Sequence, residues 1–364
     1  MKKRINNYLD YIIARGINLK PNGAVEIVTS SYIPEILDML ISRLKKYNPS
    51  VIKITFIDGD TLQEEINRDW RGFLDKRISE YNSLIKLGFS RITLLSPFLF
   101  PVCRTNSVDL YKAHLNELSF VANYFYNGYG RHTTAAISNL YWAARLELSN
   151  DELWDKILSL YKIDNELLGL KDFLNSLKIR ELSFKTGLGT NLRVGLINEA
   201  KLLGRTWYDR YGNEYEPNIP SLEIYTSPNK YRIDGIMVSS RPLFYKNKLI
   251  KDYSLEFKDG RVVANRGLDD ILCLDKGLEY VGEIALAITR DDKIYYNTLL
   301  DENLGCHLAL GCGFLNEIKS PLVNEAGLHI DLVFGTKDID ITLICDDKEI
   351  PLFKNGRLEG VKLC

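Results

Sequence analysis

At 364 residues the chain is long for a single hydrophobic core, so its length predicts two domains. Hydrophobic residues make up 45% of the sequence and charged residues 26%, which is ordinary for a soluble globular protein. The 47 basic and 48 acidic residues leave a formal net charge of -1, so no electrostatic excess favours nucleic acid or an anionic membrane as a partner.

The cysteines and the N-terminal stretch indicate where the protein works. Six cysteines are scattered without a CxxC pair, which is typical of reduced thiols in an intracellular protein. The N-terminal stretch MKKRINNYLDYIIARG has Asn, Asp and Arg between its apolar residues, so it does not resemble a signal peptide. No run of about 18 apolar residues is present to span a bilayer. We therefore expect a cytoplasmic protein with no membrane partner.

Residues 1–178 alternate short apolar runs with longer amphipathic stretches, the pattern of βαβ units. This pattern predicts strands over 24–29, 51–57 and 91–95, helices over about 33–46 and 61–87, and mostly helix over about 106–177. No glycine-rich phosphate loop is present, because Gly59 stands alone between Asp58 and Asp60, whose carboxylates would repel a phosphate. We expect an open α/β domain here.

Residues 179–364 have a different character. Alternating segments such as LRVGL, LEIYT, RVVAN and DITLIC are separated by turn signals of the Pro-Asn, Asp-Gly and Asn-Gly types. These turns favour hairpins, because Gly accepts a positive φ without a Cβ clash. The predicted fold class is therefore α/β, with an N-terminal open α/β domain (1–178) followed by a β-rich α+β domain (179–364).

Two stretches of the second half place ionisable side chains among apolar residues. NTLLDENLGCHLALG (297–311) contains Glu302 and His307, which are costly to bury unless something neutralises or ligates them. In GLHIDLVFG, His329 and Asp331 are two residues apart, so on a strand they point to the same face. Two of the chain's 4 histidines lie in these stretches, which is the first indication of a metal site.

Two further carboxylates complete the candidate set. Glu223 in PNIPSLEIYTSP lies at the start of a predicted strand, and Glu283 in YVGEIALAITR is a candidate for a buried or ligated carboxylate. Singly, each residue has a structural alternative: Glu223 as a turn cap, Glu283 as a solvent-facing strand residue, Glu302 as a helix N-terminal carboxylate, His307 as a hydrogen-bonded core histidine. Together, four carboxylates and two imidazoles without a thiolate suit two divalent cations such as Zn, Co, Mn or Mg.

The order of these motifs resembles that of the thermophilic-type metallo-aminopeptidase family, which includes aminopeptidase T, aminopeptidase S and PepS. Two upstream segments resemble the same family, GLGTNLRVGL and SSRPLFYKNKLIKDYSLEFKDGRVV. The resemblance covers most of residues 180–345. It implies a cytosolic, homodimeric exopeptidase that acts on short peptides and uses two divalent metal ions. Carried over by motif position, the metal ligands would be Glu223, Glu283, Glu302, His307, His329 and Asp331. Glu283 would also be the catalytic general base.

One position departs from the family pattern. Family members have a tyrosine in HLALGxxY, whereas HLALGCGF places Phe314 there. If that hydroxyl supports the oxyanion or a metal, its loss costs on the order of 10² to 10³ in rate. Tyr295 and Tyr296 are the candidates to replace it. Two alternatives therefore stay open: a related metal-dependent amidase or other small-molecule metalloenzyme with an altered site, and an inactive peptide-binding relative.

Overall fold

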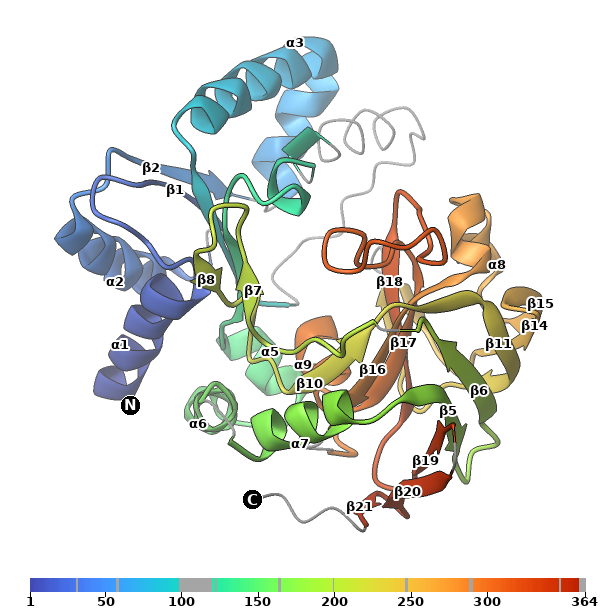
Figure 1. Cartoon of the computed structure of the whole chain (residues 1–364). Helices are drawn as coiled ribbons and strands as arrows, with labels where there is room; N and C mark the ends of the chain where they lie inside the picture. Colours follow the sequence, from blue (N-terminus) through green and yellow to red (C-terminus); the bar gives the residue numbers. More distant parts are fainter. Residues whose placement is uncertain are drawn as a thin grey trace. The chain divides into compact units, whose positions relative to one another are not determined.

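The computed structural model describes residues 1–30, 32–56, 59–97, 120–121, 123–162, 165–198, 200–245, 248–287, 291–346 and 348–359. The chain divides into two units, one of Met1–Lys162 and Thr206–Ser221, the other of Ile163–Arg205 and Leu222–Cys364 (Figure 1). This division differs from the sequence-based one at 178. The segment Thr206–Ser221 belongs to the first unit because its residues Asn218–Ile219 form a strand of the parallel sheet. The helix Asn165–Ser176, which precedes residue 178, belongs to the second unit because it packs on the strand Glu223–Thr226.

The first unit is built on a parallel sheet with the order β2-β1-β3-β4-β9 among the described residues. Its strands are β1 (Ala24–Thr29), β2 (Val51–Phe56), β3 (Ser90–Leu95), β4 (His132–Ala136) and β9 (Asn218–Ile219). The first three confirm predicted strands. Strand β4 contradicts the expectation of mostly helix in its stretch. Its short HTTAA sequence has no strong apolar alternation, and its pairing with β3 decides its conformation.

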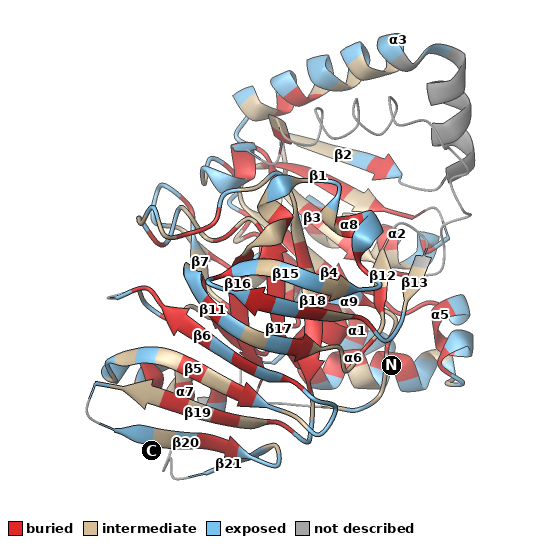
Figure 2. Ribbon diagram, turned by 90° about the vertical axis from the view of Figure 1, so that its right-hand side faces the viewer, coloured by how far each residue is buried: buried red, intermediate tan, exposed pale blue. Residues whose placement is uncertain are grey.

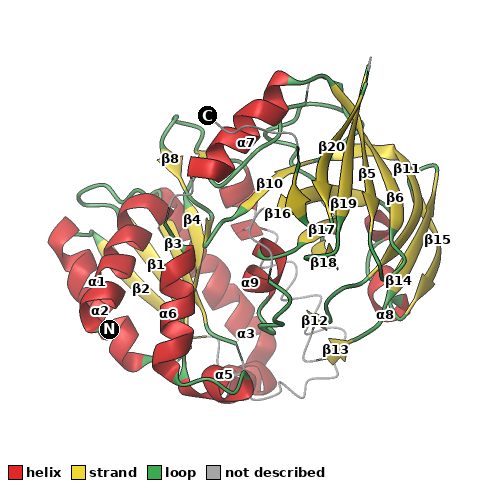
Figure 3. Ribbon diagram, turned by 90° about the horizontal axis from the view of Figure 1, so that it is seen from below, coloured by secondary structure: helices red, strands yellow, loops and turns green. Residues whose placement is uncertain are grey.

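Helices cover both faces of this sheet (Figure 3). They are α1 (Lys2–Tyr11), α2 (Pro34–Leu44), α3 (Gly59–Lys86), α5 (Leu140–Arg145) and α6 (Asn150–Leu160), with the short turns η1 (Ile12–Gly16) and η2 (Lys45–Tyr47). Tyr8 of α1 packs edge-on against Trp154 of α6, and Tyr81 of α3 packs near Phe89. The hairpin β7 (Trp207–Tyr208) and β8 (Glu214–Tyr215) precedes β9. The part of the predicted helical stretch over 106–119 lies outside the described residues.

Among its described residues the second unit contains two large antiparallel sheets and the two-stranded antiparallel sheet β12-β13, which confirm its predicted β-rich character. Among the described residues the larger sheet has the order β15-β14-β11-β6-β5-β19-β20-β21. These strands are β5 (Ile179–Lys185), β6 (Asn191–Leu196), β11 (Pro228–Val238), β14 (Ser254–Lys258), β15 (Arg261–Arg266), β19 (Asp340–Cys345), β20 (Glu349–Lys354) and β21 (Arg357–Leu358). Leu182 and Phe184 of this sheet and Leu308 and Phe334 of the smaller sheet share one hydrophobic core.

The smaller sheet has the order β10-β16-β17-β18. Its strands are β10 (Glu223–Thr226), β16 (Val281–Ala287), β17 (Cys306–Gly311) and β18 (His329–Gly335). The remaining elements are α7 (Asn165–Ser176), β12 (Leu243–Tyr245), β13 (Lys248–Ile250), α8 (Asp269–Leu272), η3 (Lys276–Glu279) and α9 (Thr298–Asn303). Strands β16 and β17 are buried at every position, whereas the outer strand β15 is largely exposed (Figure 2).

The combination of a parallel sheet with helices and separate antiparallel sheets confirms the predicted fold class. Cys273, Cys306, Cys312 and Cys345 are free thiols, and the other two cysteines lie outside the described residues. In the part of the chain that the structure describes, no helix combines the length and apolar character needed to cross a membrane.

Candidate metal centre

One face of the smaller sheet carries most of the predicted ligands. Glu283 lies opposite Ala309, and Ala309 lies opposite Asp331, while His307 lies opposite Ala285. Opposed residues, and residues two apart on one strand, share a face of the sheet. The small alanine side chains between the ionisable ones leave room above the sheet. The sequence pattern thus folds into a cluster of ionisable side chains on one face of an otherwise apolar sheet.

Strands β10 and β16 position Glu223 and Glu283. Glu223 is the first residue of the edge strand β10, and Glu283 follows a shift in the register of β16 against β17. At Gly282 a Cβ would collide with the carbonyl oxygens of Gly311 and Cys312, so glycine permits this close backbone approach. Glu223 is 5% exposed and Glu283 is 4% exposed. The solvent-facing alternative for Glu283 is therefore wrong.

Both histidines are held by backbone carbonyl groups. Nδ1 of His307 lies 3.2 Å from the carbonyl oxygens of Glu302 and Gly305, and Nδ1 of His329 lies 2.7 Å from that of Cys312. A carbonyl oxygen only accepts, so Nδ1 carries a proton and donates it in both rings. Nε2 of each ring is then turned toward the carboxylates. This is how proteins orient a metal-ligating histidine.

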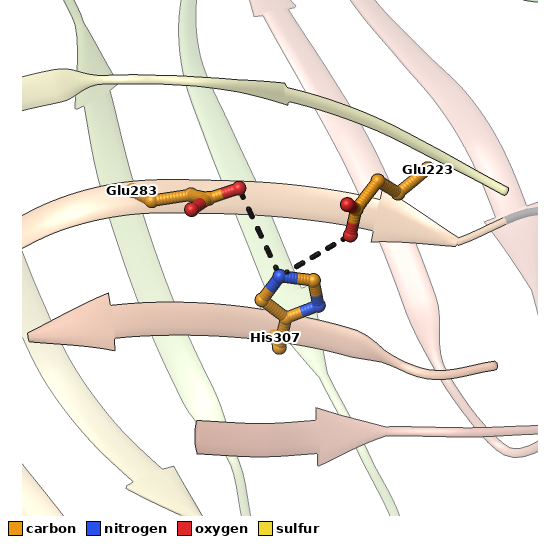
Figure 4. Close-up of side chains that lie close together, drawn as sticks. All are labelled: Glu223, Glu283 and His307. Atoms are coloured by element: carbon orange, nitrogen blue, oxygen red, sulfur yellow. Dashed lines mark ion pairs between the residues drawn. The ribbon is translucent and has the colours of Figure 1, made fainter. Parts of the chain in front are cut away.

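The two imidazoles each face a group of carboxylates. Nε2 of His307 lies 3.4 Å from Oε2 of Glu223, 3.8 Å from Oε1 of Glu283 (Figure 4) and 3.9 Å from Oδ1 of Asp331. Nε2 of His329 lies 3.0 Å from Oε2 of Glu283 and 3.2 Å from Oδ1 of Asp331. Two sets of potential ligand atoms result, Glu223–Glu283–His307 and Glu283–His329–Asp331, each with its atoms within 4.8 Å of one another. Glu283 belongs to both sets.

Glu302 reaches this centre from α9. Burial raises the pKa of its carboxyl well above the usual value, and the neighbouring carboxylates of Asp331 and Glu223 raise it further. The residue lies near the end of α9, so the alternative of a helix N-terminal carboxylate is wrong. The start of α9 is capped instead by Asn297, whose side chain accepts a hydrogen bond from the Leu300 N–H.

The buried ionisable groups of the centre shift one another's pKa values. Burial raises the pKa of Glu223 to about 8. Burial alone would lower the pKa of His307 and His329, but the carboxylates raise it well above the usual value in both rings. Against burial, His329 lowers the pKa of Asp331 to about 2. Buried Oε2 of Glu223 accepts no hydrogen bond from any described residue despite its 3.4 Å approach to His307.

Divalent cations fit this set of groups. They would replace the protons that otherwise neutralise the carboxylates and the proton on Nε2 of each imidazole, while Nδ1 keeps its proton. Oxygen and nitrogen donors without thiolate suit Zn, Co, Mn or Mg. The charge pattern and the histidine orientation therefore agree with a metal centre.

Phe314 borders this centre. Its ring centroid lies 6.2 Å from that of His329 and 4.7 Å from that of Tyr225, and its backbone N–H donates to Oγ of Ser227 at 2.8 Å. The residue that departs from the family pattern thus lies beside a predicted ligand. Its ring brings no hydroxyl group to that position.

The two tyrosines considered as replacements have different surroundings. The hydroxyl of Tyr295 donates to Oδ2 of Asp291 at 2.9 Å. Tyr296 lines a small cavity of about 20 Å³ that also borders Glu302 and Asp331. This volume holds about one water molecule. Tyr296 thus shares a cavity with two predicted ligands.

Sequence reasoning missed the buried ion pair beside Glu302. Nη1 of Arg241 donates to Oδ1 of Asp301 at 2.6 Å, across a sequence separation of 60 residues. No local pattern predicts a contact at that separation. The only available signal was an acidic residue directly before Glu302 and a lone arginine in SSRPLFY.

Comparisons with known proteins identify the family. Aminopeptidase AmpS of Bacillus subtilis (strain 168) is 24% identical over 97% of this chain and 98% of its own length. Aminopeptidase 2 of Geobacillus stearothermophilus is 30% identical over 62% of each chain. Wild-type AmpT from Thermus thermophilus has the same fold, with a TM-score of 0.85 at 21% identity over 99% of this chain and 100% of that chain. The thermophilic metalloprotease family M29 matches residues 1–358, so the chain belongs to this family, as its motifs predict.

Proposed function

We propose that this chain is an aminopeptidase that releases N-terminal residues from short peptides with a water activated by two divalent cations. The observation that carries the proposal is the position of Glu283, which offers one carboxylate oxygen to each of two sets of potential ligands. A carboxylate shared in this way is suited to serve two neighbouring cations. The aminopeptidase names of the relatives support the reaction.

Six residues would hold the cations. Glu223 and His307 face one position, His329 and Asp331 face the other, and Glu283 faces both, with Glu302 adjoining from α9. Cations bound there would polarise the scissile carbonyl, make hydroxide available near neutral pH and accept a free α-amine. The need for a free amine is the reason that only N-terminal residues would be released.

The chain's own groups account for the remaining steps. Glu283 would take a proton from the attacking water and pass it to the leaving amine as the C–N bond breaks. The carbonyl groups that hold Nδ1 of His307 and His329 keep both rings oriented throughout. We further propose a cytoplasmic location and a homodimer, as the family resemblance implies.

The test is a substrate panel with the purified protein. Leucyl p-nitroanilide and leucyl dipeptides should be cleaved, whereas acetyl-leucyl p-nitroanilide should not, because its amine is blocked. Cleavage of the acetylated substrate at an equal rate would contradict exopeptidase action.

Phe314 favours one competing function, a metal-dependent amidase or other small-molecule metalloenzyme. That function predicts bound metal with no cleavage of any free-amine peptide. An inactive peptide-binding protein would instead bind the dipeptides without cleaving them. The same panel, combined with a dipeptide binding assay, separates the three.

A further inference from the structure

The buried ion pair of Arg241 and Asp301 lies beside the metal centre and supplies none of the six predicted ligands. Arg241 belongs to the segment between β11 and β12, and its side chain is 1% exposed. Asp301 belongs to α9 and directly precedes Glu302. Burying two charged groups costs their hydration free energy. Only good geometry and further hydrogen bonds compensate for this cost. The hydrogen bonds of Arg241 and Asp301 show which parts of the backbone the ion pair holds in place.

Arg241 ties together the backbone around α9. Besides the Asp301 carboxylate, its guanidinium donates to the carbonyl oxygen of Asp301 at 3.2 Å, to that of Leu304 at 3.3 Å and to that of Asp291. The carbonyl groups at the end of a helix attract a cation. The planar guanidinium fixes the directions of these bonds, which a lysine ammonium would not do. Arg241 therefore fixes the end of α9.

Asp301 ties down the chain that leads into α9. Its Oδ1 accepts the Tyr295 N–H at 2.8 Å, and its Oδ2 accepts the Asn297 N–H at 3.0 Å. A helix as short as Thr298–Asn303 is not stable by itself in water. One ion pair thus fixes both ends of α9.

Helix α9 serves the metal centre in two ways. It carries the Glu302 carboxylate, and the carbonyl oxygens of Glu302 and Gly305 hold Nδ1 of His307 at 3.2 Å each. The carbonyl group of Leu304, which Arg241 binds, lies directly before Gly305 in the chain. A shift of this helix would move a carboxylate and rotate an imidazole of the same site.

We propose that Arg241 and Asp301 are positioning residues of the metal centre, which hold Glu302 and His307 in the orientation that binds metal. This inference rests on the metal-binding function proposed above. Partners that orient metal ligands without touching the metal change metal affinity by about 10- to 100-fold when they are replaced. The same scale is expected for this pair.

The test is metal binding by the full chain, measured separately from activity. The dissociation constant for Zn²⁺ is obtained by competition with a chromophoric chelator, and the visible absorption spectrum of bound Co²⁺ reports the ligand geometry. Arg241→Met should weaken Zn²⁺ binding about 10- to 100-fold and alter the Co²⁺ spectrum. Arg241→Lys keeps the charge without the fixed bond directions, and Asp301→Asn keeps one oxygen acceptor, so both should give smaller changes of the same kind.

Two controls separate positioning from general stability. Arg261→Met removes an arginine from an exposed pair with Glu279 in the same unit and should leave metal affinity unchanged. Leu343→Ala removes buried apolar contacts of β19 and should lower stability with the Zn²⁺ affinity retained. If Arg241→Met does not fold, the comparison is made with Arg241→Lys and Asp301→Asn.

The outcomes that overturn the inference are distinct from those that overturn the function. Wild-type affinity and an unchanged Co²⁺ spectrum in these variants would overturn the positioning role alone. So would an equal loss of metal affinity in Leu343→Ala, because the effect would then follow from stability. Absence of Zn²⁺ binding by the wild-type chain would overturn the proposed function and this inference with it.

Discussion

Each unit of the chain buries a glutamate carboxylate on a sheet, and the two carboxylates have different kinds of partner. In the first unit Glu26 on β1 is fully buried, and Oε1 accepts hydrogen bonds from Thr55 at 2.7 Å and Tyr81 at 2.9 Å. Its Oε2 accepts from Arg91 at 2.8 Å. In the second unit Glu283 lies 3.8 Å from Nε2 of His307 and 3.0 Å from Nε2 of His329. Both imidazoles also face other carboxylates. A buried acid indicates a functional site where it shares its cationic partners with other buried acids instead of having an arginine of its own.

A histidine in each unit repeats this contrast. His132 of the first unit lies among the rings of Phe125, Trp207 and Tyr215, and burial lowers its pKa to about 4. His307 is buried as well, but the surrounding carboxylates raise its pKa well above the usual value. The side chain type is the same, and burial by itself lowers the pKa of both rings. The neighbouring charges decide which histidine can belong to a metal centre.

The largest expected difference between the two carboxylates is in catalysis. Glu283→Gln should lower kcat for leucyl p-nitroanilide by about 10² to 10⁴, the usual contribution of a positioned general base. The fold should be retained, because glutamine has nearly the same shape. An unchanged kcat in this variant would remove Glu283 from the mechanism and break the contrast with Glu26.

The matched replacement in the first unit should affect stability instead. Glu26→Gln leaves the Arg91 guanidinium, which is 16% exposed, without its counter-charge, and the free energy of unfolding should fall by about 3 kcal/mol. Chemical denaturation measures this change. kcat and Zn²⁺ affinity should match those of the wild type. A loss of metal affinity in the folded variant would show that the two carboxylates are not as different as we infer.

Phe314 offers a way to strengthen the catalytic site. Phe314→Tyr places a hydroxyl beside His329, and kcat should rise by about tenfold or more, on the scale of one added hydrogen-bond donor to the reacting group. KM should change little. If kcat stays at the wild-type value, the hydroxyl at this position is not what limits the reaction, and Tyr296 becomes the group to replace.

The metal-free protein should also show a pH dependence of its stability, which involves no replaced residue. The folded state raises the pKa of Glu223 from 4.5 to about 8, so it binds a proton more tightly than the unfolded chain does. The resulting stabilisation is complete below pH 4.5 and is lost as the pH rises through about 8. The Tm of chelator-treated protein should fall over this range, and added Zn²⁺ should raise Tm more at the higher pH. A Tm that rises with pH would contradict this sign.

The sequence was sufficient to predict those strands and site residues that depend on a local residue pattern. Strands β1 and β3 follow from short apolar runs, and the placing of His329 with Asp331 on one face follows from the two-residue period of a strand. Glu283 was recognisable because a carboxylate within VGEIALA has no ordinary reason to be buried.

Other features depend on contacts between distant segments. Strand β4 forms because β3 and β9 pair with it, although HTTAA alone predicts little. The Arg241–Asp301 pair joins segments 60 residues apart, and the carbonyl groups that orient His307 and His329 belong to the backbone, which every residue has. Periodicity contains no information on such contacts.

The most direct test of the metal centre is the metal content of the purified protein, measured before and after dialysis against a chelator. Leucyl p-nitroanilide hydrolysis is followed on the same samples. About two divalent ions per chain are predicted, as a two-metal mechanism requires, with activity lost on chelation and restored by Zn, Co or Mn. A chain that hydrolyses the substrate at full rate with no bound metal would contradict the account.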